Sequence, residues 1–374
     1  MNSSENQQGV GDPSDRIAQI SDITKEQNAN KNYQHGPCLI CGKRDASKTN
    51  SHLVPSFLVS MYDSYDNSGE RGKDLLFSIS NRERSVYVGA LPDTKYEEIF
   101  DDDSLKNEDF INELKNDPNA ADYVFCPSCE ELLAKHLEAP YADSIKKNKP
   151  INAPTAYFFW ISIIWRMAAC GQDFGFRLDE SISESLHDLL TRYFDNNAVI
   201  NNLVKPQSQI FNYKLLYCPG YCEKTQRGFH FCYYNGGVLT VFIADFILIG
   251  YFNGVKDLPN DYVFECLRDS INLAKVNDGS KDKEQKLEID SDVMDAAKNT
   301  IVSYILKEKR AYFVEKICNL WSLFHIPLLL TDEIINEIIG EVFSEKLKLA
   351  ERDTDHSLAL AIGSVLNKYG FNVQ

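Results

Sequence analysis

The sequence has no long hydrophobic run and no excess of positive charge. Its longest apolar stretches, 157–165 and 238–252, are shorter than the roughly 20 residues of a membrane-spanning helix. The N-terminus is polar, so we expect no secretory signal. The net charge of −16 excludes strong non-specific binding to nucleic acid unless basic residues gather at one place. We therefore expect a cytoplasmic protein that does not contact membranes.

Several common catalytic signatures are also missing. The chain has no glycine-rich phosphate loop, no G-x-S-x-G elbow and no dinucleotide-binding fingerprint. It also has no internal repeat at a fixed period, and so gives no sign of a solenoid or a propeller. Any chemistry must come from another arrangement of residues.

The composition is that of a folded protein, with 374 residues that are 43% hydrophobic and 25% charged. We expect a flexible segment over 1–34, a zinc-binding domain over 35–150 and an α+β domain over 151–374 that is mostly helical after 290. Residues 93–118 carry many acidic side chains and predict a solvated insertion. The fold class that follows is α+β.

The hydrophobic pattern places the main elements. Residues 74–90 predict a hairpin, 207–253 predict three or four antiparallel strands with a break near Asp245, and 277–290 predict a charged linker. Helices are predicted over 154–170, 181–197, 291–318, 331–350 and 354–369.

Two C-x2-C pairs give the strongest signal in the sequence: Cys38 with Cys41, and Cys126 with Cys129. Each pair places two thiolates on one tight turn, and two such turns complete a tetrahedral sulfur site for zinc. In a reducing compartment, paired cysteines are more often metal ligands than disulfides. We therefore predict one structural Zn²⁺ ion. The alternative is four unrelated buried thiols.

Two polar residues stand beside these pairs. His52 ends a short extended segment eleven residues after Cys41, and Glu130 directly follows Cys129 where a helix is predicted to begin. The order C-x2-C, His-Leu-Val-Pro, C-x2-C and helix resembles zinc-stapled HNH proteins of the His-Me finger (ββα-metal) superfamily. The resemblance covers about 100 residues, 36–140, and also extends to uncharacterised bacterial HNH-like proteins.

The resemblance implies a treble-clef-like unit with a role for each matching position. His52 would be the general base, and Glu130 would stand where the family completes its site for a catalytic Mg²⁺ or Mn²⁺ ion. Ser51 stands where the family usually has Asp or His as a metal ligand. The family's middle Asn has no clear counterpart, and Asn119 and Asp122 are the nearest polar residues.

The implied function is a metal-dependent nuclease that acts on DNA or RNA, in mobile-element or antiphage contexts for bacterial proteins of this kind. Lys43, Arg44 and Lys48 form a modest basic patch near His52. The C-terminal region would choose the substrate or a protein partner. The alternative is a non-catalytic, zinc-stabilised module that binds protein or nucleic acid.

Other candidates are weaker. Cys218, Cys222, His230 and Cys232 could bind a second metal or could be packed in a sheet. For Arg166, the alternatives are a charge at a helix end and a phosphate contact. His136, Glu138 and His187 complete the candidates: Glu138 lies nearer the Glu130 face of a helix than His136, and the two histidines are expected to be structural or on the surface.

Overall fold

The computed structural model describes residues 36–49, 51–63, 74–80, 85–92, 120–121, 123–170, 176–195, 210–225, 228–342 and 355–371. The expected flexible segment 1–34 and the acidic segment 93–118 lie outside these residues. The chain forms two compact units, Pro37–Lys316 and one that contains Ile317–Gln374. The boundary expected near residue 150 falls within the first unit.

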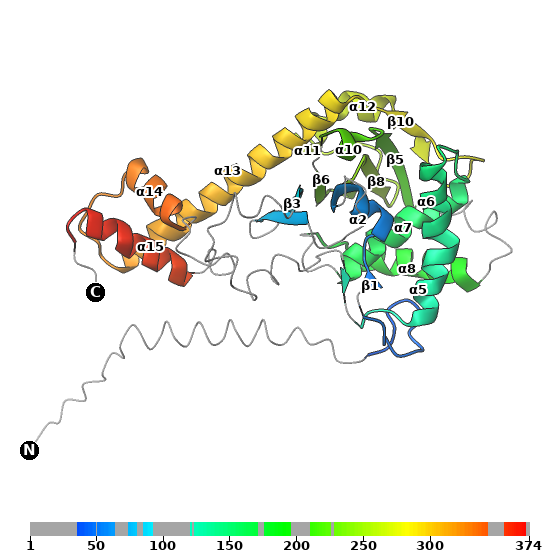
Figure 1. Ribbon diagram of the computed structural model, residues 1–374, viewed down its shortest axis with the longest axis horizontal. Helices are drawn as coiled ribbons and strands as arrows, with labels where there is room; N and C mark the ends of the chain where they lie inside the picture. Colours follow the sequence, from blue (N-terminus) through cyan, green and yellow to red (C-terminus); the bar gives the residue numbers. More distant parts are fainter. Residues whose placement is uncertain are drawn as a thin grey trace, which may run out of the picture. The chain divides into compact units, whose positions relative to one another are not determined.

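A single sheet organises the first unit (Figure 1). Within the described residues it has eight strands, in the order β10-β5-β8-β7-β6-β3-β2, with β9 also paired to β5. Their bounds are β2 Asp74–Ser80, β3 Ser85–Pro92, β5 Phe211–Tyr217, β6 Gly228–Asn235, β7 Val238–Ile243, β8 Phe246–Phe252, β9 Val276–Asn277 and β10 Lys286–Glu288. The predicted hairpin and the predicted antiparallel strands are both confirmed. They belong to one sheet, because β3 pairs with β6 through the register Val86↔Phe231.

The turns of the sheet follow from local chemistry. Gly236 and Gly237 both have positive φ, as a two-residue turn between β6 and β7 requires. The predicted break near Asp245 is the turn between β7 and β8. The Asp245 carboxylate is buried and accepts bonds from the backbone N–H groups of Gly220 (2.8 Å) and Cys222 (2.9 Å), which hold the short helix α10 (Tyr221–Thr225).

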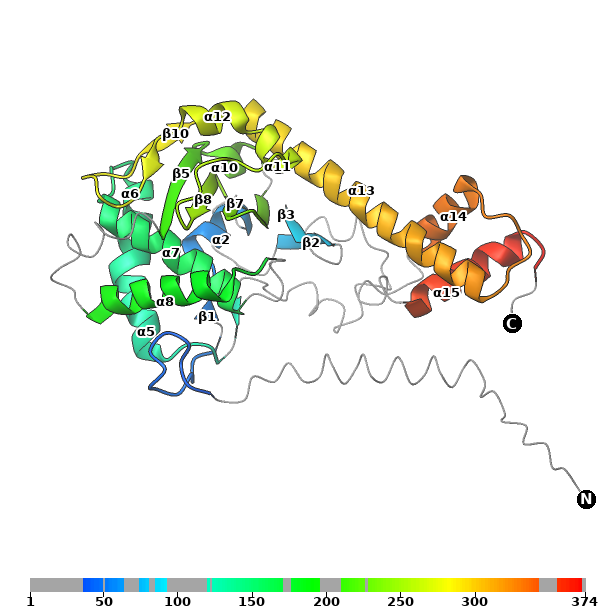
Figure 2. The same cartoon turned by 180° about the vertical axis from the view of Figure 1, so that it is seen from behind.

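Helix α7 (Ala153–Cys170) lies between the sheet and helix α8 (Glu180–Asp195), as both views of the ribbon show (Figures 1 and 2). Every residue from 156 to 167 of α7 is buried. A helix that is hydrophobic on all its faces is stable where protein covers it on every side. The position of α7 between the sheet and α8 therefore accounts for its long hydrophobic run. The hydroxyl of Tyr157 donates to the carbonyl oxygen of Phe211 on β5 at 2.8 Å and fixes the helix to the sheet.

The segment 277–290 is more than the charged linker that its composition predicted. It contributes β10 and the buried carboxylate of Glu284, which accepts bonds from the Tyr141 hydroxyl (2.9 Å), the Trp160 indole (3.0 Å) and the Tyr213 hydroxyl (2.7 Å). Burial and then the Glu284 charge raise the pKa of both tyrosines, so each keeps its proton to donate. A buried carboxylate is tolerated here because three donors satisfy it.

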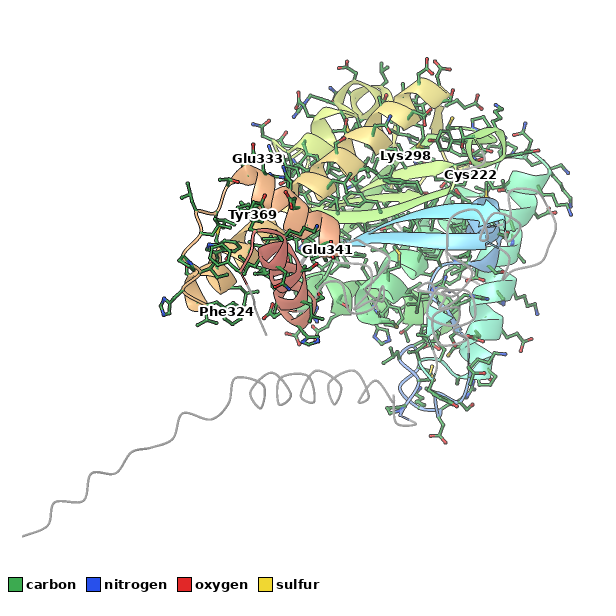
Figure 3. The ribbon with its side chains drawn as sticks, turned by 60° about the vertical axis from the view of Figure 1, so that its left-hand side comes forward. Cys222, Lys298, Phe324, Glu333, Glu341 and Tyr369 are labelled. Carbon is green, nitrogen blue, oxygen red and sulfur yellow. The ribbon has the colours of Figure 1, made fainter. Side chains whose placement is uncertain are left out.

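The remaining elements complete the two units. Short pieces in the first unit are β1 Ser51–His52, α2 Ser56–Asp63, β4 Ala120–Ala121, α5 Pro127–Leu133, the π-helical turn η2 Ala134–Glu138, α6 Ala139–Lys146, α11 Tyr262–Glu265 and α12 Arg268–Leu273. The predicted C-terminal helices are α13 Ser291–Leu323, α14 Asp332–Val342 and α15 Asp355–Lys368. Glu341 of α14, labelled in Figure 3, accepts a hydrogen bond from the hydroxyl of Ser364 of α15 at 2.8 Å. None of the helices in the described ranges is long and apolar enough to cross a membrane.

Candidate functional site

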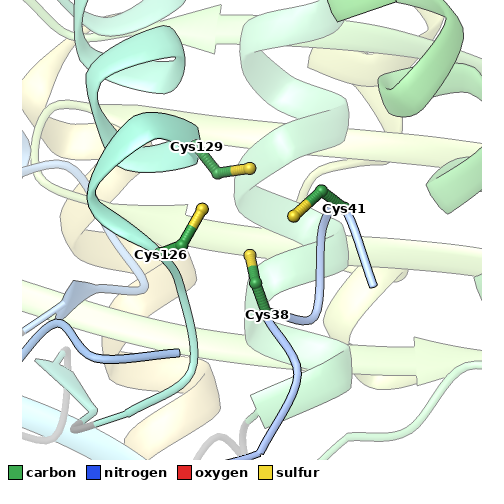
Figure 4. Close-up of side chains that lie close together, drawn as sticks. All are labelled: Cys38, Cys41, Cys126 and Cys129. Atoms are coloured by element: carbon green, nitrogen blue, oxygen red, sulfur yellow. The ribbon is translucent and has the colours of Figure 1, made fainter. Parts of the chain in front are cut away.

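The four predicted zinc ligands lie together. The sulfur atoms of Cys38, Cys41, Cys126 and Cys129, here called the cysteine cluster, are all within 4.8 Å of one another, and Figure 4 shows the side chains converging on one point. Tetrahedral zinc with bonds of about 2.3 Å places its sulfurs about 3.8 Å apart. All ten cysteines of the chain are described, and each is free. The cluster is therefore compatible with a structural zinc ion and is not a pair of disulfides.

Backbone bonds shape the first cysteine turn. The N–H of Gly42 donates to the carbonyl of Cys38 at 2.8 Å, and the N–H of Cys38 donates to Arg44 at 2.7 Å. Gly42 has φ +62, a conformation that a side chain disfavours. The backbone N–H of Leu39 donates to the carbonyl of Val124 at 3.0 Å. This hydrogen bond holds the second cysteine pair next to the first. The turn is thus built by its own backbone and by the segment that carries Cys126.

The second cysteine pair opens helix α5. Cys126 has extended geometry at the N-cap, Pro127 follows as the first helical residue, and Cys129 donates its N–H to the carbonyl of Cys126 at 3.1 Å. A hydrogen bond from Cys129 lowers the pKa of the Cys38 thiol to about 4, whereas that bond and burial raise the pKa of Cys129. Four converging sulfur atoms are a ligand set that suits a soft cation.

A short ladder carries His52 next to the cluster. Strand β1 pairs antiparallel with β4 through Ser51↔Ala121 and His52↔Ala120. Adjacent residues of a strand point to opposite faces, so Ser51 is fully buried while His52 is only partly buried. Asn119 and Asp122, the nearest matches to the family's middle Asn, lie outside the described residues.

His52 and Glu130 line the same cavity, which has a volume of about 530 Å³. The other ionisable residues that line it are Lys48, Glu131, Glu138 and Arg166. Lys48 lies 3.8 Å from the Glu130 carboxylate. The cavity therefore brings together a histidine, three acidic side chains and two basic ones.

A π-helical turn explains why Glu138 faces this cavity. Pro140 has no N–H to donate to the carbonyl of His136, and its ring crowds that oxygen. The helix widens here, with Ala139 donating to Ala134, and the hydroxyl of Tyr193 donates to the freed His136 carbonyl at 3.5 Å. A π turn adds about one residue per turn. Because each residue of the π turn rotates less about the helix axis, Glu138 comes closer to the face of Glu130 than it would in a regular helix.

Arg166 joins the cavity from α7. Its side chain is only 2% exposed, and one Nη1 nitrogen donates both to the Glu138 carboxylate (2.8 Å) and to the carbonyl of His52 (2.7 Å). Its Nε donates to the carbonyl of Ser162 at 3.1 Å. The sequence did not indicate that one guanidinium would link His52 to Glu138, because the three residues are far apart along the chain.

No second metal cluster forms among the described residues. There, the cysteine cluster alone brings three or more candidate ligand atoms within 4.8 Å. His52 and the three cavity carboxylates do not converge to that degree. Mg²⁺ is commonly held by one or two carboxylates together with water and substrate phosphate, and Glu130 fits that more open arrangement.

The second group of cysteines is packed in the sheet and around α10. Cys232 lies 3.6 Å from the Nε2 of His230 and 4.0 Å from the sulfur of Met167, and all three are buried. Burial lowers the pKa of His230 to about 3. Burial and the Asp245 charge raise the pKa of Cys222, which is labelled in Figure 3. Neutral thiols in an apolar sheet are poor metal ligands.

No protein-family model matches the chain, and neither a curated protein nor a solved structure is significantly similar to it. Any function therefore has to be inferred from the geometry of the cavity and the cysteine cluster.

Proposed function

We propose that the protein is a metal-dependent HNH-type nuclease that hydrolyses phosphodiester bonds. The observation that carries the proposal is that His52 and Glu130, far apart in sequence, line one cavity beside the cysteine cluster. In this proposal, the cysteine turn, the β1–β4 ladder and helix α5 would together make up a treble-clef-like ββα-metal unit. A zinc ion in the cluster would hold this unit together and take no part in the chemistry.

Three residues of the cavity have roles in this proposal. The neutral imidazole of His52 takes a proton from the attacking water. Glu130 offers a carboxylate oxygen to Mg²⁺ or Mn²⁺, and such an ion, when bound, polarises the scissile phosphate and stabilises the leaving oxygen. Lys48 adds positive charge at the cavity rim, where a phosphate backbone would pass. The region after residue 150 would select the DNA or RNA strand or a protein partner, in a bacterial defence or mobile-element setting.

One observation favours a second candidate function. Ser51 occupies the position of a family metal ligand and is fully buried, so it does not line the cavity. A protein that has lost this ligand would keep the zinc-stabilised scaffold and use the cavity only to bind protein or nucleic acid. The net charge of −16 also fits a weak affinity for nucleic acid.

Cleavage assays test the nuclease proposal. Supercoiled plasmid and a single-stranded RNA are incubated with wild type and His52→Ala, each with Mg²⁺ or Mn²⁺. We expect wild type to cut one of them and His52→Ala to be slower by about 100-fold or more, as the loss of a general base predicts. His356→Ala, at an exposed position of α15, is the matched control and should cut at the wild-type rate. Equal rates for wild type and His52→Ala, or no cutting at all, would contradict the proposal.

Metal binding separates the two candidates. Mn²⁺ binding is followed by electron paramagnetic resonance for wild type, Glu130→Gln and the control Glu265→Gln, whose carboxylate is exposed and paired with Arg268 at 2.8 Å. The nuclease proposal predicts one Mn²⁺ site that Glu130→Gln weakens by about tenfold or more, which corresponds to about 1.4 kcal/mol. A wild type that holds zinc and binds no Mn²⁺ would favour the binding module.

A further inference from the structure

The ion pair between Glu138 and Arg166 is the most deeply placed charge contact of the cavity. Arg166 is 2% exposed, Glu138 is 20% exposed, and both line the cavity that contains His52. A buried guanidinium must be paired, because an isolated charge away from water is strongly unfavourable. Glu138 is the anion that now fulfils this need, at 2.8 Å.

The partners of Arg166 leave it suited to a second anion. Its Nε and Nη1 donate to the carbonyls of Ser162 and His52, which fix the guanidinium to α7 and to β1. Its Nη2 makes a long contact of 3.5 Å with the Ser162 hydroxyl. The fork is therefore held in place by neutral oxygens, and among the residues that the structure describes Glu138 is the charged group that it contacts. Arginine is well matched to phosphate because its fork can donate two parallel bonds.

We propose that Arg166 is a phosphate-binding subsite of the cavity and that Glu138 is an internal stand-in for that phosphate. A phosphate that enters displaces the Glu138 carboxylate from Arg166, while the guanidinium stays in place on the carbonyls of Ser162 and His52. The bond to the His52 carbonyl then ties the bound phosphate to the residue proposed as base. The inference rests on the proposed function only in identifying the phosphate with that of a nucleic-acid strand.

Charge explains why such a stand-in would matter. An incoming phosphate meets three acidic side chains in the cavity, those of Glu130, Glu131 and Glu138, and two basic ones. Like charges in one site oppose binding. With Glu138 on Arg166, the cavity rejects adventitious anions, and only a ligand with further contacts competes for the guanidinium. The π turn places Glu138 to do this, so the helix irregularity has a consequence for binding.

Binding without added divalent cation tests the subsite separately from hydrolysis. The probes are inorganic phosphate, followed by calorimetry, and a fluorescein-labelled single-stranded oligonucleotide of DNA or RNA, followed by anisotropy at low salt. Glu138→Gln keeps an oxygen that can accept from Arg166 and removes the negative charge. We expect it to bind the oligonucleotide about tenfold more tightly than wild type does.

Two variants control for the general change in charge. Glu131→Gln removes a carboxylate from the same cavity, and the described part of the chain shows no bond between Glu131 and Arg166. We expect this variant to bind less than about twofold more tightly, as for a screened surface charge. The double variant Glu138→Gln with Arg166→Gln should lose the gain completely. Because the central result is a gain of binding, misfolding does not imitate it.

The outcomes distinguish the subsite from the nuclease. A gain in Glu138→Gln that disappears with Arg166→Gln supports the subsite even if wild type never cuts a strand, in which case only the proposed function fails. A gain for inorganic phosphate alone supports the subsite and assigns it to a free phosphate. Equal gains in Glu138→Gln and Glu131→Gln, or a gain that survives Arg166→Gln, would overturn the inference.

Discussion

The Nε2 of His187 lies 2.8 Å from the carbonyl oxygen of Ile40, between the two cysteines of the first turn. Its ring also stacks on Trp165 of α7, with 5.0 Å between ring centroids. His187 therefore ties the cysteine cluster to two helices of the core. The sequence indicated a structural role for this histidine without showing which contact it makes.

Replacing His187 should loosen this attachment. We expect His187→Ala to lower the free energy of unfolding by about 1–3 kcal/mol, the sum of one hydrogen bond and one ring contact. It should also speed the transfer of zinc to a chromogenic chelator. Urea denaturation and a chelator assay measure the two effects. The exposed His356→Ala is the control, and a His187→Ala variant as stable as His356→Ala would contradict the role.

The cysteine cluster predicts a sharp difference between two serine variants. Cys126→Ser removes one of four converging thiols, so the protein should lose most of its zinc and about 3 kcal/mol or more of stability. Cys318→Ser changes an exposed thiol on α13 and should keep one zinc ion per chain. Elemental analysis and thermal unfolding check both. The same zinc content in the two variants would remove the case for the cluster as a metal site.

Glu284 should make the folded protein less stable as the pH rises. Burial raises its pKa above the ordinary 4.5, so the folded chain takes up its proton more readily than the unfolded chain does. The contribution of Glu284 to stability is then fully present below the ordinary pKa and declines as pH rises through the raised one.

The variant Glu284→Gln tests this prediction. Its amide N–H₂ group would face a hydroxyl or indole donor, so at least one hydrogen bond to the side chain would be lost. We expect a loss of about 2–4 kcal/mol, with a larger difference from wild type at pH 5 than at pH 8. Denaturant titrations at both pH values give the comparison. Glu288→Gln, exposed on β10, should show neither effect. A difference that grows as pH rises would contradict the predicted sign.

Two glycines should respond in opposite directions to the same substitution. A Cβ at Gly250 on β8 would lie 2.8 Å from the ring of Phe211, so Gly250→Ala should be destabilised by about 1–3 kcal/mol. A Cβ at Gly340 on α14 meets nothing within 4 Å, and Gly340→Ala should be stabilised by about 0.5–1 kcal/mol because alanine favours helix. Thermal unfolding of the two variants measures both effects. A Gly250→Ala variant as stable as wild type would contradict the first prediction, and a destabilised Gly340→Ala variant would contradict the second.

Local patterns predicted much of this structure. The spacing of Cys38 and Cys41 predicted the cysteine cluster, and the alternation of residues 74–90 predicted the hairpin. The pairing of β3 with β6 was not predictable, because it joins segments more than a hundred residues apart and no local propensity encodes such a register. For the same reason the burial of Glu284 was missed, since its donors come from three other elements.

The candidate site was predicted only in part. His52 and Glu130 could be named from their positions beside the cysteines, and both line the same cavity. The link through Arg166 depends on the course of α7, and the approach of Glu138 depends on how the helix accommodates Pro140. Both arise from tertiary structure and a helix irregularity that a regular 3.6-residue period does not reveal.

The separation of the two cysteine pairs has a consequence for how the chain acquires its fold. Eighty-four residues lie between Cys41 and Cys126, and bringing the ends of such a loop together costs about 4 kcal/mol of chain entropy. During synthesis the first turn alone offers only two sulfur ligands, and tight metal capture must wait until residue 129 has left the ribosome. If the cluster holds zinc, binding of the metal and closing of this loop are therefore coupled steps.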